Sequence, residues 1–390
     1  FGVCGGCKWQ HMKYEAQLRF KQKEVSENLK RIGGIELPDL NPILGVKNPY
    51  WYRNKMEFSF SNQRWLTKEE IESGIKINRN ALGFHKPGMW DKIVNVTTCH
   101  LQADPSNSIR NFIRDYAHKN DLSFFDPKKQ NGFLRSLMIR TTLTHEVMVV
   151  LQVFQKENQL LFPLLDAVIK QFPNITSLQY VVNIKANDTL YDQEIICYEG
   201  QDFITELMEN LQFKITAKSF YQTNSLQAYE LYKVVREFAN LEGDELVYDL
   251  YTGTGTIAQF ISQKARKVIG VDVVPESIDA AKANADHNTI KNVSFETGDM
   301  KAIFTKDFIE RNGKASIVIT DPPRNGMHKN VVQQLLELSP DRIIYVSCNS
   351  ATQARDLALM KEQYSLVASQ AVDMFPQTHH VENVVLLEKG

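Results

Sequence analysis

The sequence Asp249-Leu250-Tyr251-Thr252-Gly253-Thr254-Gly255-Thr256 lies where a short apolar run ends and a segment with helical periodicity begins. Its glycines permit the positive φ angles of a tight turn and allow a ligand to approach the backbone closely. A strand, a glycine-rich turn and a helix in this order are typical of domains that bind a cofactor at the end of a parallel strand. The segment therefore predicts a cofactor loop.

Strand-like and helix-like segments alternate regularly around this loop, from Phe213 onward. Short apolar runs lie at Glu245–Asp249, Lys267–Asp272, Val293–Glu296, Ser316–Thr320, Arg342–Val346 and Val384–Leu387. Such alternation predicts a mostly parallel sheet with helices on both faces, that is, an α/β Rossmann-like domain, which we place at residues 216–390. Ligands of these sheets bind beyond the carboxyl ends of the strands.

The glycines alone leave the cofactor open, because Gly253-x-Gly255-x-x-Ala258 also satisfies the dinucleotide pattern. Asp272 closes the next strand, where its carboxylate could accept hydrogen bonds from ribose hydroxyls of either cofactor. Asp249, Asp299 and Asp321 at strand ends would oppose the charge of a diphosphate. These carboxylates favour S-adenosylmethionine over a nicotinamide dinucleotide.

Cys348 is the candidate nucleophile. The run Tyr345-Val346-Ser347-Cys348-Asn349 places it directly after an expected buried strand and before an expected helix. Loop amides and a helix N-terminus can favour the reactive thiolate at such a position. A lone cysteine is more often a small core residue than a nucleophile, and the position of Cys348 after a strand only partly favours the catalytic role.

Two further polar loops follow strand ends in this half. In Asp321-Pro322-Pro323-Arg324-Asn325-Gly326 the prolines stiffen the backbone that holds Asp321 beside the cofactor crevice. The loop from Asp373 to Glu382 precedes the last strand and contains His379 and His380. Adjacent histidines point in different directions, so they indicate a metal site only weakly.

In their order along the chain, these motifs resemble those of the RNA (uracil-5-)-methyltransferase family. The resemblance rests on Ser219-Phe220-Tyr221-Gln222-Thr223-Asn224, the Asp-Leu-Tyr-x-Gly-x-Gly loop, Asp-Pro-Pro-Arg-x-Gly, Val-Ser-Cys-Asn and the His-His-Val-Glu ending, and it covers the whole catalytic half. The chain has Thr252 where the family often has Cys, Asp272 where it often has Glu, and Ser350 where it often has Pro.

The resemblance implies methylation of carbon 5 of a uridine in RNA by an S-adenosylmethionine-dependent enzyme. It implies that Cys348 adds to carbon 6 of the ring and that Glu382 later removes the carbon-5 proton. A base in folded RNA must be extruded to reach such a site. The residues implied for the cofactor are Gln222, Tyr251, Thr256, Asp272, Asp299 and Asp321, and those implied for the substrate are Phe220, Gln222 and Asp321.

The first 215 residues are expected to form an α+β domain that carries most of the positive charge. Residues 1–150 contain 23 Lys and Arg against 15 Asp and Glu, whereas the whole chain has a net charge of −1. This charge asymmetry fits a domain that binds a polyanion. Chance segregation of surface charge explains it equally well. An amphipathic helix from about Met12 to Ile32 could pack on the catalytic domain. Other expected strands lie at Lys55–Phe60, Ser136–Thr142, Val147–Phe154 and Ser177–Asn183, and expected helices at Ser106–Lys119 and Phe162–Phe172.

Cys4-Gly5-Gly6-Cys7 has the spacing of metal ligands, and Cys99 is a candidate remote partner. Three thiolates are one short of the four that a structural zinc or an iron–sulfur cluster needs. In one branch of the resembled family, Cys-x-x-Phe-Gly-x-Cys-Gly-Gly-Cys holds a 4Fe-4S cluster, and Phe1–Cys7 fits this pattern from its fourth element onward. The resemblance thus implies such a cluster, with a ligand and a small RNA-binding barrel upstream of Phe1, and zinc is the alternative metal.

This branch favours 23S ribosomal RNA as the substrate, with transfer RNA as the alternative. Five cysteines in a long chain make no disulfide framework, and the apolar runs are too short to span a bilayer. We therefore expect a cytoplasmic, monomeric enzyme without a membrane anchor. An NAD-dependent oxidoreductase would leave Cys348 and Glu382 without roles, and a non-catalytic RNA-binding protein would leave the whole reactive set unexplained.

Overall fold

The computed structural model describes residues 2–38 and 40–390, and the chain forms two compact units. Unit 1 comprises Phe1–Gln10, Tyr50–Leu207 and Lys214–Lys218, and unit 2 comprises His11–Pro49, Met208–Phe213 and Ser219–Gly390. The sequence was expected to divide once, near residue 215. The division is instead discontinuous, because the helix expected at 12–32 is part of unit 2 and buries its apolar side in that core.

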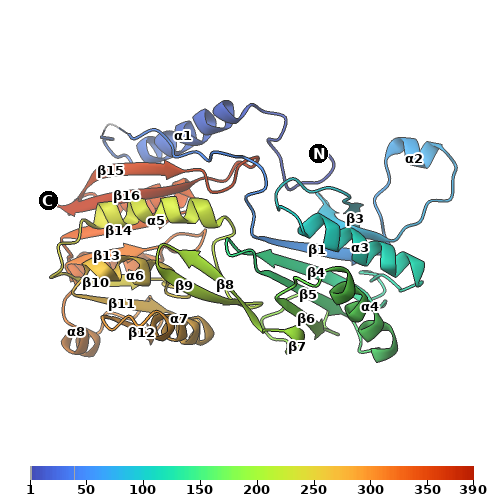
Figure 1. Cartoon of the computed structure of the whole chain (residues 1–390). Coiled ribbons are helices and arrows are strands. Elements are labelled where there is room, and N and C mark those ends of the chain that lie inside the picture. The colour runs from blue at the N-terminus through green and yellow to red at the C-terminus, as the bar shows by residue number, and fades with distance from the viewer. Residues whose placement is uncertain (1, 39) are drawn as a thin grey trace. The chain divides into compact units, whose positions relative to one another are not determined.

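Unit 2 is built on a seven-stranded sheet that is parallel except at one edge (Figure 1). Its order is β12 (Val293–Thr297), β11 (Lys267–Asp272), β10 (Leu246–Leu250), β13 (Ile317–Thr320), β14 (Arg342–Ser347), β16 (Glu382–Lys389) and β15 (Tyr364–Val372). Strand β16 runs antiparallel to both β14 and β15. The carboxyl ends of the parallel strands therefore meet the beginning of β16 at one edge of the sheet.

Helices cover this sheet, and several of these helices are capped at the N-terminus by a side chain. The helices are α1 (Tyr14–Arg31), α5 (Ser225–Ala239), α6 (Thr256–Ile261), α7 (Pro275–His287), α8 (Lys306–Asn312), α9 (Lys329–Leu338) and α10 (Ser350–Ala358), with a 3₁₀ turn at Ser262–Lys264. Asn224 caps α5 and Asn349 caps α10, each by accepting a bond from a backbone amide. These caps satisfy amides that have no partner within the helix.

Helix α1 joins this unit although it lies far from the sheet in sequence. Val25 and Leu29 are fully buried in one hydrophobic cluster with side chains of β10, β14 and α10. The helix ends before Gly33-Gly34, and Gly34 has a φ of 57°, which glycine adopts at no steric cost. Burial of this apolar face is what holds α1 on the sheet.

Unit 1 contains a second seven-stranded sheet with mixed strand directions. Its order is β3 (Met89–Asn95), β2 (Ala81–Lys86), β1 (Lys55–Ser61), β4 (Leu134–Thr141), β5 (Val147–Val153), β6 (Ser177–Val182) and β7 (Ile195–Gly200), with helices α2 (Lys68–Glu72), α3 (Ser106–Lys119) and α4 (Asn158–Gln171). Strands β8 (Phe203–Met208) and β9 (Leu211–Thr216) form a separate two-stranded sheet. All seven residues of β5 are buried, as expected for a strand covered on both faces.

Within the described residues, no helix is both long and apolar enough to cross a membrane.

Candidate active site

The register of β14 and β16 brings the candidate nucleophile and the candidate base together. Ser347 pairs with Asn383 at the end of the antiparallel ladder between these strands. Cys348 and Glu382 each lie one residue beyond that pair, on the same side of it. Residues that face each other in an antiparallel pair are neighbours in space. Two motifs that are separate in sequence thus form one site.

Burial and mutual repulsion dominate the electrostatics of this site. Burial first, and then the charge of Asp321, raise the pKa of Glu382 to about 8, against the opposing charge of Arg324. Burial also raises the pKa of the Cys348 thiol to about 11, with Glu382 and Asp321 acting in the same direction and Arg324 against them. Glu382, Asp321 and Arg324 thus lie within electrostatic range of the Cys348 thiol. Cys348 is half-buried, so its sulfur can be reached from outside.

Two more carboxyl groups lie behind this set. Burial raises the pKa of Asp321 to about 7, and the charge of Asp249 adds to the effect. Burial likewise raises the pKa of Asp249 to about 7, although a hydrogen bond from the Thr252 hydroxyl opposes it. Thr252 stands where the resembled family often has cysteine. Here its hydroxyl holds the buried carboxyl at the start of the glycine loop.

The glycine loop leaves its backbone open to a ligand. Gly253 has a φ of 54°, and an added Cβ would meet no atom within 4 Å. The two carboxylate oxygens of Asp272 accept hydrogen bonds from the amides of Gly253 and Val274, at 2.9 Å each. This carboxylate therefore fixes the loop against the end of β11. The open space beside Gly253 fits the close approach of a cofactor.

The other predicted cofactor residues gather around the same loop. Burial raises the pKa of Tyr251 to about 12, and the charges of Asp356, Asp299 and Asp272 contribute to the rise. The hydroxyl oxygens of Thr254 and Thr256 are 3.4 Å apart. The sequence motifs at the ends of β10, β11 and β12 thus meet in space.

The segment before α5 contacts the glycine loop and a buried tyrosine of α5. The Thr254 hydroxyl donates to the backbone oxygen of Phe220 at 3.4 Å, and the Phe220 ring is 61% exposed. Gln222 hydrogen-bonds through its side chain with Tyr232, a buried residue of α5 whose pKa is raised first by burial and then by Asp321. We did not single out Tyr232 from the sequence, because a tyrosine within an amphipathic helix carries no signal of its own.

The predicted metal site is not shown by the structure. Burial raises the pKa of Cys7 to about 11, and the charges of Cys99 and Cys4 add to this, so the three sulfurs lie within electrostatic range of one another. Even so, residues 2–38 and 40–390 contain no group of three or more His, Cys, Asp or Glu that could hold a metal ion. The described residues therefore do not show the predicted 4Fe-4S site.

Comparisons with known proteins show the family to which this chain belongs. A protein of Bacteroides thetaiotaomicron, called an uncharacterized RNA methyltransferase, is 55% identical over all of this chain and 86% of its own length. One of Chlorobaculum tepidum with a similar name is 39% identical over all of this chain and 82% of its own. The crystal structure of Pyrococcus abyssi tRNA (uracil-54, C5)-methyltransferase in complex with S-adenosyl-L-homocysteine matches with a TM-score of 0.78 and 30% identity, over 99% of this chain and 86% of that one. The sequence model of the tRNA (uracil-5-)-methyltransferase family matches residues 140–390, and the chain belongs to this family of RNA-methylating enzymes.

Proposed function

We propose that this enzyme transfers a methyl group from S-adenosylmethionine to carbon 5 of a uridine in RNA, with Cys348 as a covalent nucleophile. The observation that carries the proposal is that Cys348 and Glu382 each lie one residue beyond the Ser347–Asn383 pair of β14 and β16, where the charges of Glu382 and Asp321 act on the thiol. The Pyrococcus abyssi relative was solved in complex with S-adenosyl-L-homocysteine, which supports S-adenosylmethionine as the donor, and the open space beside Gly253 supports a cofactor at this loop.

The reaction needs a nucleophile because carbon 5 of uracil reacts poorly with a methyl donor. In the proposed mechanism, the Cys348 thiolate forms a bond to carbon 6, and the ring electrons move onto carbon 5. Carbon 5 then takes the methyl group, and S-adenosylhomocysteine leaves. Glu382 removes the carbon-5 proton, the bond between sulfur and carbon 6 breaks, and the thiolate is restored.

The raised pKa of Glu382 suits it to this role. A general base works best when its pKa lies near the working pH, and burial brings that of Glu382 to about 8. Asp321 and Gln222 are proposed to hold the uracil edge and the cofactor, with Phe220 as an exposed surface on which an extruded base can stack. Tyr251, Thr256, Asp272 and Asp299 are proposed to line the cofactor pocket.

Replacement of the nucleophile tests the proposal. We expect Cys348→Ala to abolish formation of 5-methyluridine while S-adenosylmethionine still binds, because the thiol makes the ring reactive and does not hold the cofactor. Labelled cofactor with an RNA transcript measures the first property, and calorimetry measures the second. Cys197→Ala is the matched control, since Cys197 is an exposed free thiol in unit 1. Full turnover by Cys348→Ala would refute the covalent mechanism.

We propose 23S ribosomal RNA as the first substrate to test, on the grounds of the Cys-x-x-Cys motif at Cys4 and Cys7. Transfer RNA is the second candidate, and the Pyrococcus abyssi enzyme, which acts on tRNA uracil 54, supports it. Unmodified transcripts of both RNAs, offered separately with labelled cofactor, decide between them. Iron and zinc analysis of the same purified protein tests the proposed 4Fe-4S cluster, which needs more ligands than the described residues bring together.

A further inference from the structure

The loop at 373–381 leads directly into the proposed base, Glu382 at the start of β16, yet it contains no helix or strand. It connects β15 to β16, and its two ends are joined where Val372 pairs with Glu382. Asp373 therefore begins the loop directly beyond the residue that faces Glu382. Loops are usually the most mobile parts of a fold. Contacts from another part of the chain must therefore fix this loop if Glu382 is to meet the carbon-5 proton at a defined position.

Lys21 of helix α1 reaches into this loop. Its Nζ lies 2.5 Å from Oδ1 of Asp373 and donates to the backbone oxygen of Phe375 at 3.1 Å. Both side chains of the ion pair are fully buried. The Tyr14 hydroxyl donates to the other carboxylate oxygen of Asp373 at 2.9 Å. A buried ion pair is weak evidence for stability, and its better-attested use is to select one conformation.

A second contact lies one turn along the same helix. Gln17 Nε2 donates to Gln377 Oε1 at 3.0 Å, and the backbone amide of Gln377 donates to Gln17 Oε1 at 2.9 Å. Tyr14, Gln17 and Lys21 are spaced by three and four residues, so they lie on one face of the helix. This face thus binds the loop at its first residue, at Phe375 and at Gln377.

We propose that helix α1 positions Glu382 for removal of the carbon-5 proton, through Lys21, Tyr14 and their contacts to Asp373. The inference rests on the proposed covalent mechanism and adds positioning residues that the site motifs do not include. Proton removal requires a base within hydrogen-bond reach, and an error of about 1 Å in such a position can cost about a hundredfold in rate. Cys348 follows a different strand, so a shift of the loop should affect it less.

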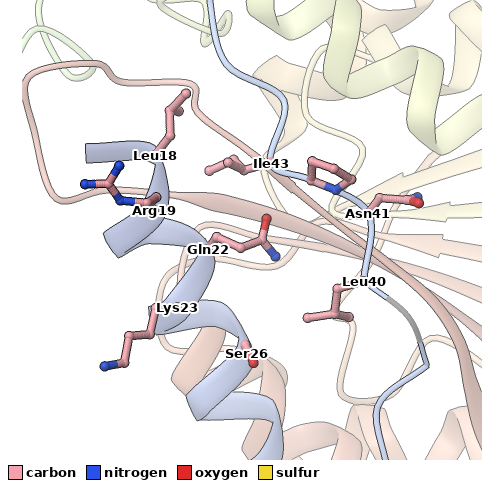
Figure 2. Close-up of a pocket in the computed structure, with 9 residues that line it drawn as sticks. Leu18, Arg19, Gln22, Lys23, Ser26, Leu40, Asn41 and Ile43 are labelled. Carbon is pink, nitrogen blue, oxygen red and sulfur yellow. The ribbon is translucent and has the colours of Figure 1, made fainter. Parts of the chain in front are cut away.

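The opposite side of α1 supplies a control. Lys23 is two residues from Lys21 and therefore faces the other side of the helix, and Figure 2 shows it at the edge of a pocket of about 460 Å³ formed with residues 40–43. Lys23 is exposed. Lys23→Met therefore makes the same chemical change on the same helix without touching the loop.

The test measures methyl transfer and product release separately in a single turnover with saturating cofactor and RNA. Acid quenching and a denaturing gel follow the labelled methyl group in the covalent protein–RNA adduct and in free RNA. For Lys21→Met we expect release to slow by about tenfold or more, with methyl transfer within about twofold of the parent enzyme. Deuterium at carbon 5 of the target should then slow release further, because proton removal limits it. Tyr14→Phe should slow the same step less, and Lys23→Met should change neither.

Each outcome either supports or overturns the positioning role of α1. Equal slowing of both steps in Lys21→Met would show general damage to the fold, and unchanged release would show that the loop holds itself; either overturns the positioning role. If Lys21→Met does not fold, Tyr14→Phe carries the test, because it removes one hydroxyl from the same cluster. A parent enzyme that forms no adduct would instead refute the covalent mechanism.

Discussion

The proposed mechanism requires a thiolate at Cys348, where the surroundings of the sulfur disfavour one. Burial raises the pKa of this thiol to about 11, and the neighbouring carboxylates of Glu382 and Asp321 act in the same direction. The resting enzyme therefore holds a neutral thiol at neutral pH. A proton must leave the sulfur as the uracil ring arrives, and the buried carboxyls beside it are the groups that can receive it.

Replacement of the base separates it from the nucleophile. Glu382→Gln keeps the size of the side chain and removes its ability to accept the carbon-5 proton. We expect methyl transfer to continue and the adduct to persist, because the bond from sulfur to carbon 6 breaks only after that proton leaves. A gel-shifted species that survives denaturation and contains labelled methyl measures this. Rapid release of methylated RNA by Glu382→Gln would assign the base to another residue.

The pH dependence follows from the same groups. The active form needs Glu382 ionised and Cys348 able to lose its proton, and the pKa of each is raised. Activity should therefore fall as the pH drops below about 8, the pKa of Glu382, and should rise toward alkaline pH. We expect the rate of release of methylated RNA from the adduct, measured in a single turnover, to increase by about tenfold per pH unit below that value, because Glu382 acts after methyl transfer. A flat profile from pH 6 to 9 would contradict these assignments.

Among the structural elements, the turn between β10 and α6 depends most on glycine. Gly253 combines a φ of 54° with open space around the place of a side chain. Asp272, at the end of β11, fixes the turn through the Gly253 amide. The element thus exposes backbone in a conformation that other residues adopt only with strain.

Substitution of this glycine should weaken cofactor binding beyond its effect on stability. Gly253→Ala adds a methyl group in the space we assign to S-adenosylmethionine and should lower the free energy of unfolding by about 1 kcal/mol. Gly34→Ala is the matched control, because Gly34 has a φ of 57° and equally open space but lies after α1. Denaturant unfolding and calorimetry compare the two variants. Equal cofactor affinity in both would place the cofactor elsewhere.

For the molecule as a whole, the division of charge matters for RNA. Residues 1–150 carry an excess of Lys and Arg, although the whole chain has a net charge of −1. Sequence-independent contacts to phosphates come from such cations, and they weaken as salt rises because counterions are released.

RNA binding and cofactor binding should therefore differ in salt dependence. We expect the logarithm of RNA affinity to fall linearly with the logarithm of salt concentration, with a slope of about −0.7 for each single-stranded phosphate contacted. S-adenosylmethionine affinity should change little over the same range, since the cofactor site gains no polyanion. Fluorescence anisotropy and calorimetry measure the two affinities. RNA affinity that is independent of salt would exclude the charge asymmetry as its source.

Local sequence patterns predicted many of the strands of unit 2. Alternating apolar runs and helical segments predicted β10–β14 within one or two residues, because periodicity and turn chemistry act over short distances. Strand β15 escaped prediction since its residues, Tyr364–Val372, mix small and polar side chains that become buried only against β16. The hairpin strands β2 and β3 and the strands β7, β8 and β9 were missed for a similar reason.

Strand ends and glycine turns are local features, so the amino-acid order alone predicted a cofactor loop and a candidate nucleophile at Cys348. The role of Glu382 came from the family resemblance, and these roles stay predictions. Contacts between distant segments were not readable in this way. The pairing of Ser347 with Asn383, which brings Cys348 beside Glu382, is set by the packing of an antiparallel strand. The bond from Lys21 to Asp373 spans 352 positions. Both contacts form only in the folded chain, where water is excluded and buried polar groups must find partners. They could therefore be seen only in the tertiary structure.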